Sequence, residues 1–171
     1  PVVPMRGFGL DPRKLDLLAP ETDTEVRFLP AGEWLRTPAA VRNTFTATAW
    51  TLRPDSNRMG YRLSGPALQR DTPLEMLSHA IVPGTIQLPP DGSPVIQLND
   101  ANTCGGYPKL GVVIDADLPL LAQARLGTSI RFTQVDRITA ITARQKRRTF
   151  LDWLPGRIAL ARDYAQRFEA V

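Results

Sequence analysis

Two polar segments of the chain combine residue types that can do chemistry. The first covers residues 56–62, Ser-Asn-Arg-Met-Gly-Tyr-Arg, and places two guanidinium groups, an amide and a phenol on a tight turn and the strand that it feeds. Guanidinium forks suit carboxylates and phosphates, and Gly60 allows close approach to the backbone. No acidic residue stands next to Arg58, so we expect Arg58 to contact an anionic substrate rather than to close an ion pair.

The second segment covers residues 99–108, Asn-Asp-Ala-Asn-Thr-Cys-Gly-Gly-Tyr-Pro, a polar loop between two apolar stretches. Asp100 can act as a base or orient a substrate nitrogen, while Gly105 and Gly106 can present backbone N–H groups to an oxyanion. The alternative for both segments is turn chemistry with surface ion pairs, in which Asp100 only caps its loop. The spacing alone leaves both interpretations open.

Three further features favour a structural role. Ser78-His79 lacks a carboxylate at a spacing that supports a triad, so a hydrogen-bonded structural histidine is expected. Cys104 is interpreted as a small buried thiol in preference to an activated thiolate. The basic run at Arg144, Lys146, Arg147 and Arg148 is typical of a solvated helix face and not of a nucleic-acid site.

The elements that must position these residues are short. The 16 prolines and 12 glycines divide the chain into small pieces, which disfavours long helical bundles. Strands are expected at residues 26–29, 46–53, 61–63, 85–88, 95–98, 110–114 and 129–134. Short helices are expected at 39–44 and 116–122, and after residue 135 the pattern becomes helical, with a break at Pro155-Gly156 and a final helix to about Phe168.

This pattern predicts a mainly β protein, an antiparallel barrel with C-terminal helices. We expect a linker or extended arm over 1–24, the barrel over 25–135 and a helical appendage over 136–171. Neither a G-x-G-x-x-G motif nor a Walker A motif is present, which argues against a Rossmann domain and a P-loop.

Composition excludes several classes of protein. One cysteine permits no internal disulfide, and one histidine permits no multi-histidine metal site, so no metal site is expected. No apolar run approaches the roughly 20 residues that span a bilayer, and a net charge of +4 is a small excess. We expect a soluble, cytoplasmic protein that binds neither membrane nor nucleic acid. Because the chain begins with proline, we also expect a fragment, a processed product or one domain of a longer polypeptide.

Three ordered motifs carry a resemblance to a known family. They are Ser-Asn-Arg-Met-Gly-Tyr-Arg-Leu-x-Gly at 56–65, Gly-Thr-Ile-Gln-Leu-Pro at 84–89 and Asp-x-x-Thr-x-Gly-Gly-Tyr-Pro at 100–108. Together they resemble the C-terminal half of the family of the 5-oxoprolinase C subunit and allophanate hydrolase subunit 2, a biotin-dependent carboxyltransferase-type domain with subdomains A and B. The similarity covers roughly residues 25–135, with departures at Asn102 and Cys104, where glutamine and threonine are expected.

The resemblance implies a cyclophilin-like barrel that lacks the N-terminal half of the family's architecture. It implies an ATP-dependent 5-oxoprolinase that opens 5-oxo-L-proline to L-glutamate with a homologous partner, similar to the 5-oxoprolinase B subunit or to allophanate hydrolase subunit 1. On this basis catalysis is expected from Asp100, Arg58 and Tyr107. Substrate binding is expected from Asn57, Arg62, Gln87, Thr103, Gly105 and Gly106.

Two alternatives stay open, because one fold can host several functions. The first is a carboxyltransferase domain that acts on urea or a similar small amide, as in urea carboxylase. The second is a non-catalytic regulator that binds a partner which inhibits a kinase. The chain carries no biotinyl-lysine signature, which favours the oxoprolinase interpretation.

Overall fold

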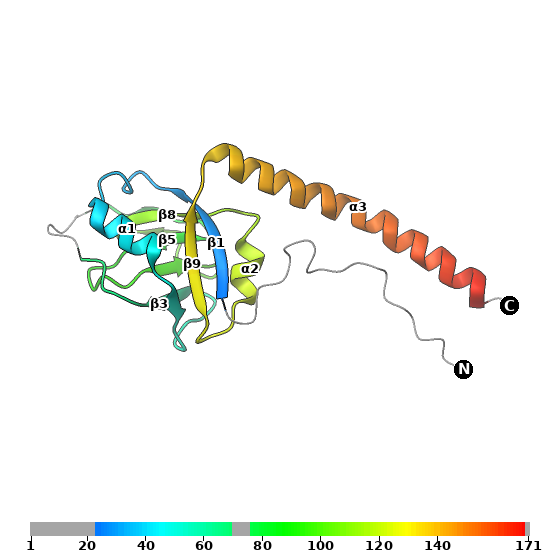
Figure 1. The fold of residues 1–171 in the computed structure, drawn as a ribbon, viewed down its shortest axis with the longest axis horizontal. Coiled ribbons are helices and arrows are strands. Elements are labelled where there is room, and N and C mark those ends of the chain that lie inside the picture. The colour runs from blue at the N-terminus through cyan, green and yellow to red at the C-terminus, as the bar shows by residue number, and fades with distance from the viewer. Residues whose placement is uncertain (1–22, 70–75, 170–171) are drawn as a thin grey trace.

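The chain forms a closed β-barrel with a long helix attached. In a computed structural model that describes residues 23–69 and 76–169, seven strands close in the order β1-β8-β5-β6-β3-β2-β9 (Figure 1). Their bounds are β1 Asp23–Pro30, β2 Trp50–Leu52, β3 Gly60–Ser64, β5 Thr85–Gln87, β6 Val95–Gln97, β8 Lys109–Val113 and β9 Ser129–Gln134. The predicted fold class is confirmed, with one parallel pair, β1 beside β9, in an otherwise antiparallel barrel.

Buried and accessible side chains alternate along β1, which explains its place in the barrel. Val26 and Phe28 are fully buried, while the neighbouring side chains are more accessible, as expected for a strand with one face on a core. Val26 lies opposite Phe132 of β9 and Phe28 opposite Val113 of β8, so β1 closes the sheet on both edges. This register places every buried side chain of β1 inside the barrel.

Aromatic side chains fill the core at the side covered by α1 (Ala39–Ala47). Phe45 of this helix stacks on Phe132, with ring centroids 4.6 Å apart, and meets Phe28 edge-on at 5.6 Å. Trp50 is fully buried, and its indole N–H donates to the Phe45 carbonyl oxygen. These contacts tie the end of α1 to the start of β2.

The strand expected over residues 46–53 is shorter than predicted. Helix α1 continues through Ala47, and β2 begins only at Trp50. The hydroxyls of Thr44, Thr46 and Thr48 donate to carbonyl oxygens four residues earlier. These bonds let a threonine-rich stretch, normally typical of a strand, finish a helix.

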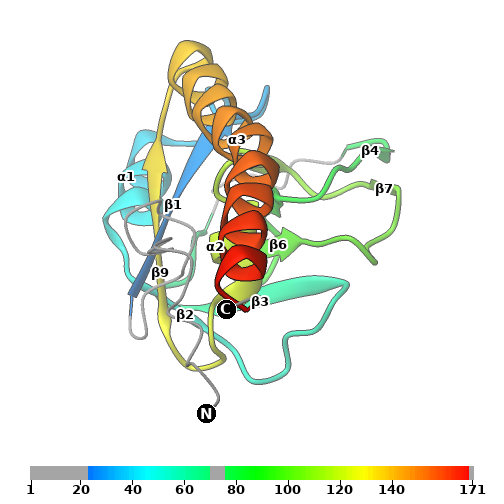
Figure 2. The same cartoon turned by 90° about the vertical axis from the view of Figure 1, so that its right-hand side faces the viewer.

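A small second sheet projects from the barrel (Figure 2). It consists of β4 (His79–Ala80) and β7 (Cys104–Gly105), which pair antiparallel with His79 opposite Gly105 and Ala80 opposite Cys104. We call this sheet the flap. It comes from the two loops that flank the β5–β6 hairpin and therefore stands beside the second polar segment.

The C-terminal region is one helix. After α2 (Leu118–Gln123), helix α3 runs without interruption from Arg137 to Glu169, and its C-terminal part extends well beyond the barrel (Figure 1). The predicted break at Pro155-Gly156 is wrong. Pro155 cannot donate a hydrogen bond from its own nitrogen, and its ring crowds the carbonyl group four residues earlier. In a 33-residue helix the turns on both sides nevertheless continue past it.

Candidate functional site

A cleft of about 370 Å³ brings together most of the predicted substrate-binding residues. It lies between the first polar segment and the loop that carries β7 of the flap. Its walls include predicted site residues from all three sequence motifs, namely Asn57, Arg62, Gln87, Gly105, Gly106 and Tyr107. Thr103, Arg58 and Asp100 do not line it.

A pair of glutamines forms the most distinctive polar feature of the cleft. Gln87 lies on β5, a strand whose three side chains are all buried, and only 4% of the residue is exposed. The Nε2 atom of Gln97 on β6 donates to Oε1 of Gln87 at 2.8 Å. Nε2 of Gln87 has no hydrogen-bond partner among the residues that the structure describes. A buried donor without an acceptor is costly, and a carbonyl or carboxylate oxygen would satisfy it.

Gly105 of the flap covers this unpartnered donor. A Cβ atom at position 105 would lie 2.7 Å from Nε2 of Gln87 and 2.8 Å from Cδ1 of Ile81. Only glycine therefore allows β7 to approach Gln87 so closely. Gly106 follows it in the cleft wall, where a Cβ would meet the Met76 carbonyl oxygen at 3.2 Å.

Arg62 supplies a positive charge on the same face of the sheet as Gln87, because both residues lie opposite Val95 of β6. Its Nε atom lies 3.8 Å from Oδ2 of Asp55, and about half of its side chain is exposed. Arg53 binds the same carboxylate with two hydrogen bonds of 2.9 Å, so Asp55 is engaged mainly by Arg53. The Arg62 guanidinium thus keeps donors for an anionic group in the cleft.

Asn57 shapes the turn of the first polar segment. Its Oδ1 accepts the N–H of Met59 at 2.9 Å, and its backbone pairs with Gly60. This Asx-type bond is the turn chemistry offered above as the alternative for the segment. Asn57 therefore combines a structural role with a position on the cleft wall.

Arg58 and Asp100 bind each other outside the cleft. Nε of Arg58 lies 3.1 Å from Oδ2 of Asp100, and Nη2 donates to Oδ1 at 3.3 Å. The Asp100 N–H also donates to the Arg58 carbonyl oxygen, so the two polar segments meet at this point. The expectation that Arg58 closes no ion pair is wrong, because the fold brings Asp100 beside it from 42 positions away. The catalytic roles predicted for both residues stay predictions.

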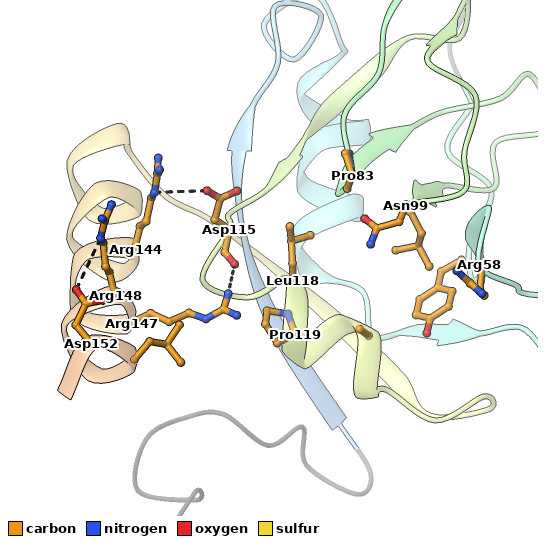
Figure 3. A pocket seen from close by; sticks show the side chains of 14 residues that line it. Arg58, Pro83, Asn99, Asp115, Leu118, Pro119, Arg144, Arg147, Arg148 and Asp152 are labelled. Carbon is orange, nitrogen blue, oxygen red and sulfur yellow. Dashed lines mark hydrogen bonds and ion pairs between the residues drawn. The ribbon is translucent and has the colours of Figure 1, made fainter. Parts of the chain in front are cut away.

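Arg58 faces a second, larger groove of about 720 Å³ between the barrel and α3 (Figure 3). Arg144 and Arg147 of α3 bind Asp115, through its carboxylate and its carbonyl oxygen respectively, and Arg148 lies near Asp152. Tyr61 also lines this groove, and burial raises the pKa of its phenol. The basic run of α3 thus partly docks the helix on the barrel, in addition to facing solvent as predicted.

Cys104 is exposed, which corrects the expectation of a buried thiol. Cys104 lies on β7 of the flap. Because the flap stands outside the barrel, the side chains of the flap are not enclosed in the core. Its neighbour Tyr107 is also accessible, with about half of its surface exposed.

Sequence reasoning missed Gln97 and a charged cluster behind the flap. Lys109 is buried at the start of β8 and contacts His79 and Gly105, and Glu33 lies beside His79. A lysine at the head of an apolar strand, directly after the Gly-Gly-Tyr-Pro motif, is a signal that could have found it. His79 is hydrogen-bonded, as the structural interpretation expected.

Within residues 23–69 and 76–169, no group of three or more histidine, cysteine, aspartate or glutamate side chains could hold a metal ion. In the same part of the chain, none of the helices has the length and apolar character of a membrane span.

The barrel and its motif-lined cleft define a carboxyltransferase-type domain. The family described as carboxyltransferase domain, subdomain A and B, matches residues 7–134, and the chain belongs to this family. Among curated proteins it is similar to the 5-oxoprolinase C subunit of Haemophilus influenzae, with 46% identity over 127 residues. It is also similar to the 5-oxoprolinase C subunit of Escherichia coli K12, with 41% identity over 133 residues.

The matched regions cover 74% and 78% of this chain but only 41% and 43% of those relatives. The chain therefore spans about two fifths of the length of the curated proteins it matches. Among solved structures, the Kluyveromyces lactis urea carboxylase aligns with a TM-score of 0.64 and 23% identity, over 72% of this chain and 12% of that one. That likeness supports the fold.

Proposed function

We propose that this chain is part of an ATP-dependent 5-oxoprolinase, which opens 5-oxo-L-proline to L-glutamate together with a homologous partner subunit. The identity to two proteins named as the C subunit of 5-oxoprolinase supports this choice. In this proposal ATP supplies the driving force within the complex. The partner and the other half of the family's architecture complete the molecule.

The observation that carries the proposal is the unpartnered amide nitrogen of Gln87 in the wall of the cleft. A lactam is a planar N–C=O unit, and its carbonyl oxygen is the acceptor that Nε2 of Gln87 lacks. In this proposal the flap moves aside to admit it, because Gly105 covers Nε2 in the structure. The side-chain oxygen of Gln97 can accept the lactam N–H, because its nitrogen already serves Gln87. Arg62, which lies on the same sheet face on the other side of Val95, then suits the carboxylate of 5-oxoproline.

Opening the lactam ring requires that the charge on its carbonyl oxygen be stabilised. When water adds to the lactam carbonyl, negative charge develops on that oxygen, and donors already aimed at it lower the barrier. Gln87 and the backbone N–H group of Gly106 are the donors that we assign to it, because the Gly105 N–H belongs to the ladder between β4 and β7. The C–N bond then breaks as a proton from the added water passes to the nitrogen, leaving a carboxylate and the free amine of glutamate.

The test is release of glutamate from 5-oxoproline by this chain combined with its partner subunits and ATP. Reactions without ATP, and without this chain, serve as controls. We expect glutamate only in the complete mixture. A parallel reaction with urea distinguishes the main alternative, since consumption of urea with no glutamate release would replace the proposal by a urea-directed carboxyltransferase.

A further inference from the structure

Lys109 places a buried ammonium group beside the unpartnered amide nitrogen of Gln87. The two residues lie opposite each other in the pairing of β5 with β8, so both side chains stand on the same face of the sheet. Both residues are almost fully buried, with 5% and 4% of their surfaces exposed. The ammonium group and the amide nitrogen are therefore two neighbouring hydrogen-bond donors that are withdrawn from water.

Gly105 of the flap occupies the space in front of these two donors. Nζ of Lys109 donates to the Gly105 carbonyl oxygen at 3.3 Å. A Cβ atom on Gly105 would lie 2.7 Å from Nε2 of Gln87. Gly105 is thus within reach of both nitrogens, and its carbonyl group accepts a hydrogen bond from Lys109 as the carbonyl group of a bound amide would.

Among the residues that the structure describes, the close polar contacts of the Lys109 ammonium are with the flap. Besides the Gly105 carbonyl oxygen, Nζ lies 2.6 Å from Nε2 of His79, which belongs to β4. Burial lowers the pKa of Lys109, against the opposing effects of Glu33 and then Cys104. Moving the flap aside takes both contacts from the ammonium group. Its hydrogen bonds are then available to the group that replaces the flap.

We propose that Gly105 holds the place of the substrate carbonyl group, and that Lys109 binds the lactam carbonyl oxygen together with Gln87 once the flap moves aside. This inference rests on the proposed function, which requires the lactam to reach Nε2 of Gln87. A charged donor stabilises the negative charge that develops on the oxygen more strongly than a neutral amide does. Lys109 is therefore a further catalytic residue of the cleft, and the closed flap competes with the substrate.

The alternative is that Lys109 only fastens the flap. Lys109→Met would then remove a bond of the closed state and ease the entry of a ligand. If Lys109 also binds the lactam, the same substitution removes a bond of the open state, so the two effects oppose each other. A variant whose flap is already displaced separates them.

Gly105→Ala is such a variant. Its Cβ atom would collide with Nε2 of Gln87 and, at 2.8 Å, with Cδ1 of Ile81, so the flap cannot close as it does in the wild type. The probe is 2-pyrrolidinone, a five-membered lactam whose binding does not involve Arg62 because it has no carboxylate. Nitrogen-15 NMR of the Gln87 side-chain amide follows the titration without ATP, partner or turnover. In the wild type, the nuclear Overhauser effect between this amide and the Gly105 Hα atoms reports a closed flap.

We expect 2-pyrrolidinone to abolish that Overhauser effect, and to bind Gly105→Ala more tightly than the wild type. Adding Lys109→Met to Gly105→Ala should weaken binding about 10–100-fold, the usual effect of losing a hydrogen bond to a charged group. Adding Lys146→Met instead, on the exposed face of α3, is the matched control and should leave the affinity unchanged. Circular dichroism checks that each variant is folded. Lys109→Gln keeps a neutral donor, replaces Lys109→Met if that variant does not fold, and should weaken binding by a smaller factor.

Four results would overturn the assignment. Equal affinity of Gly105→Ala with and without the Lys109 substitution would leave Lys109 as a fastener of the flap. Equal affinity of Gly105→Ala and the wild type, or an Overhauser effect retained at saturating lactam, would show that the flap does not compete. A Gln87 amide that no lactam shifts would remove the site. Missing glutamate release in the complete mixture, by contrast, rejects the oxoprolinase reaction and leaves a lactam site that depends on Lys109.

Discussion

At the residue scale, the cleft holds one buried donor, Nε2 of Gln87, whose removal should affect turnover far more than folding. Gln87→Met keeps a similar volume and removes the unpartnered Nε2, although it also takes the acceptor from Gln97. We expect a free energy of unfolding within about 1 kcal/mol of the wild type, because one unsatisfied group is exchanged for another. Turnover in the reconstituted complex should fall about 10²–10³-fold, as for a lost oxyanion donor.

Denaturant unfolding and glutamate release on the same Gln87→Met preparation check this expectation. Val95→Ala, a partly buried position on the same cleft wall, is the matched control for disturbed packing. Full turnover in Gln87→Met would remove Gln87 from the site.

Arg58 and Asp100 form an exposed pair, with 87% and 45% of their side-chain surfaces accessible. Solvent screens such pairs, so Arg58→Lys and Asp100→Asn should each change the free energy of unfolding by less than about 1 kcal/mol. The variants therefore probe the predicted roles in a folded protein. If Asp100 serves as a general base, turnover of Asp100→Asn falls about 10²–10⁴-fold, and retained turnover rejects that role.

At the scale of the elements, Gly111 determines how β8 meets β1. A Cβ at this position would touch the Phe28 ring and lie 2.5 Å from the Leu29 carbonyl oxygen. Because the backbone of β1 cannot withdraw without breaking the barrel ladder, Gly111→Ala should destabilise the chain by about 1–3 kcal/mol or more. Gly32→Ala, with open space around it, is the control and should be close to neutral in the same thermal melts.

Asp136 caps the start of α3 and makes the helix sensitive to acid. Its Oδ1 accepts the Thr139 N–H at 2.7 Å, and this bond lowers the pKa of the carboxyl below its ordinary value of 3.8. A lowered folded-state pKa means that the cap stabilises the helix above pH 3.8 and that this contribution is lost as pH falls through the lowered value.

Circular dichroism at 222 nm should therefore show helix loss below pH about 4 in the wild type. Asp136→Asn caps without titrating, so it should lack this acid step, whereas Asp136→Ala should have weaker helix at all pH values. If Asp136→Asn loses the same amount of helix below pH about 4 as the wild type, the loss comes from another carboxyl group.

At the scale of the whole molecule, α3 exposes much apolar surface. Among the described residues, its exposed large hydrophobic side chains are Ile138, Ile141, Leu151, Trp153, Ile158 and Leu160. Since the chain spans about two fifths of its curated relatives, we predict that the rest of the family's architecture or a partner covers this surface. Sedimentation of the chain with its partner subunit should show a complex, and a stable monomer without affinity for it would contradict the prediction.

Trp153 offers a local measure of the same prediction. Trp34 and Trp50 are buried, whereas Trp153 is 48% exposed, so acrylamide should quench chiefly Trp153 in the free chain. Binding of the partner at α3 should reduce that quenching. The variant Trp153→Phe should lose the effect, which separates protection at α3 from a general change.

Local pattern was enough to predict most barrel strands. The run at residues 129–134 became β9 with those bounds, and the two runs around Pro89-Pro90 became the β5–β6 hairpin. The alternation of apolar and polar residues and the residue types of turns act over a few positions, so they can be recognised in a single sequence. The break at Pro155-Gly156 failed because the continuity of a helix depends on the turns on both sides as well as on the local breaker.

The amino-acid sequence by itself determined the class of fold, the three motifs and thus most of the cleft. Only the tertiary structure decided which polar groups meet. It paired Arg58 with Asp100, left Nε2 of Gln87 without a partner and joined Glu33, His79 and Lys109 behind the flap. The physical reason is that hydrogen bonds and ion pairs form between atoms about 3 Å apart, and barrel closure brings such atoms together from distant parts of the chain.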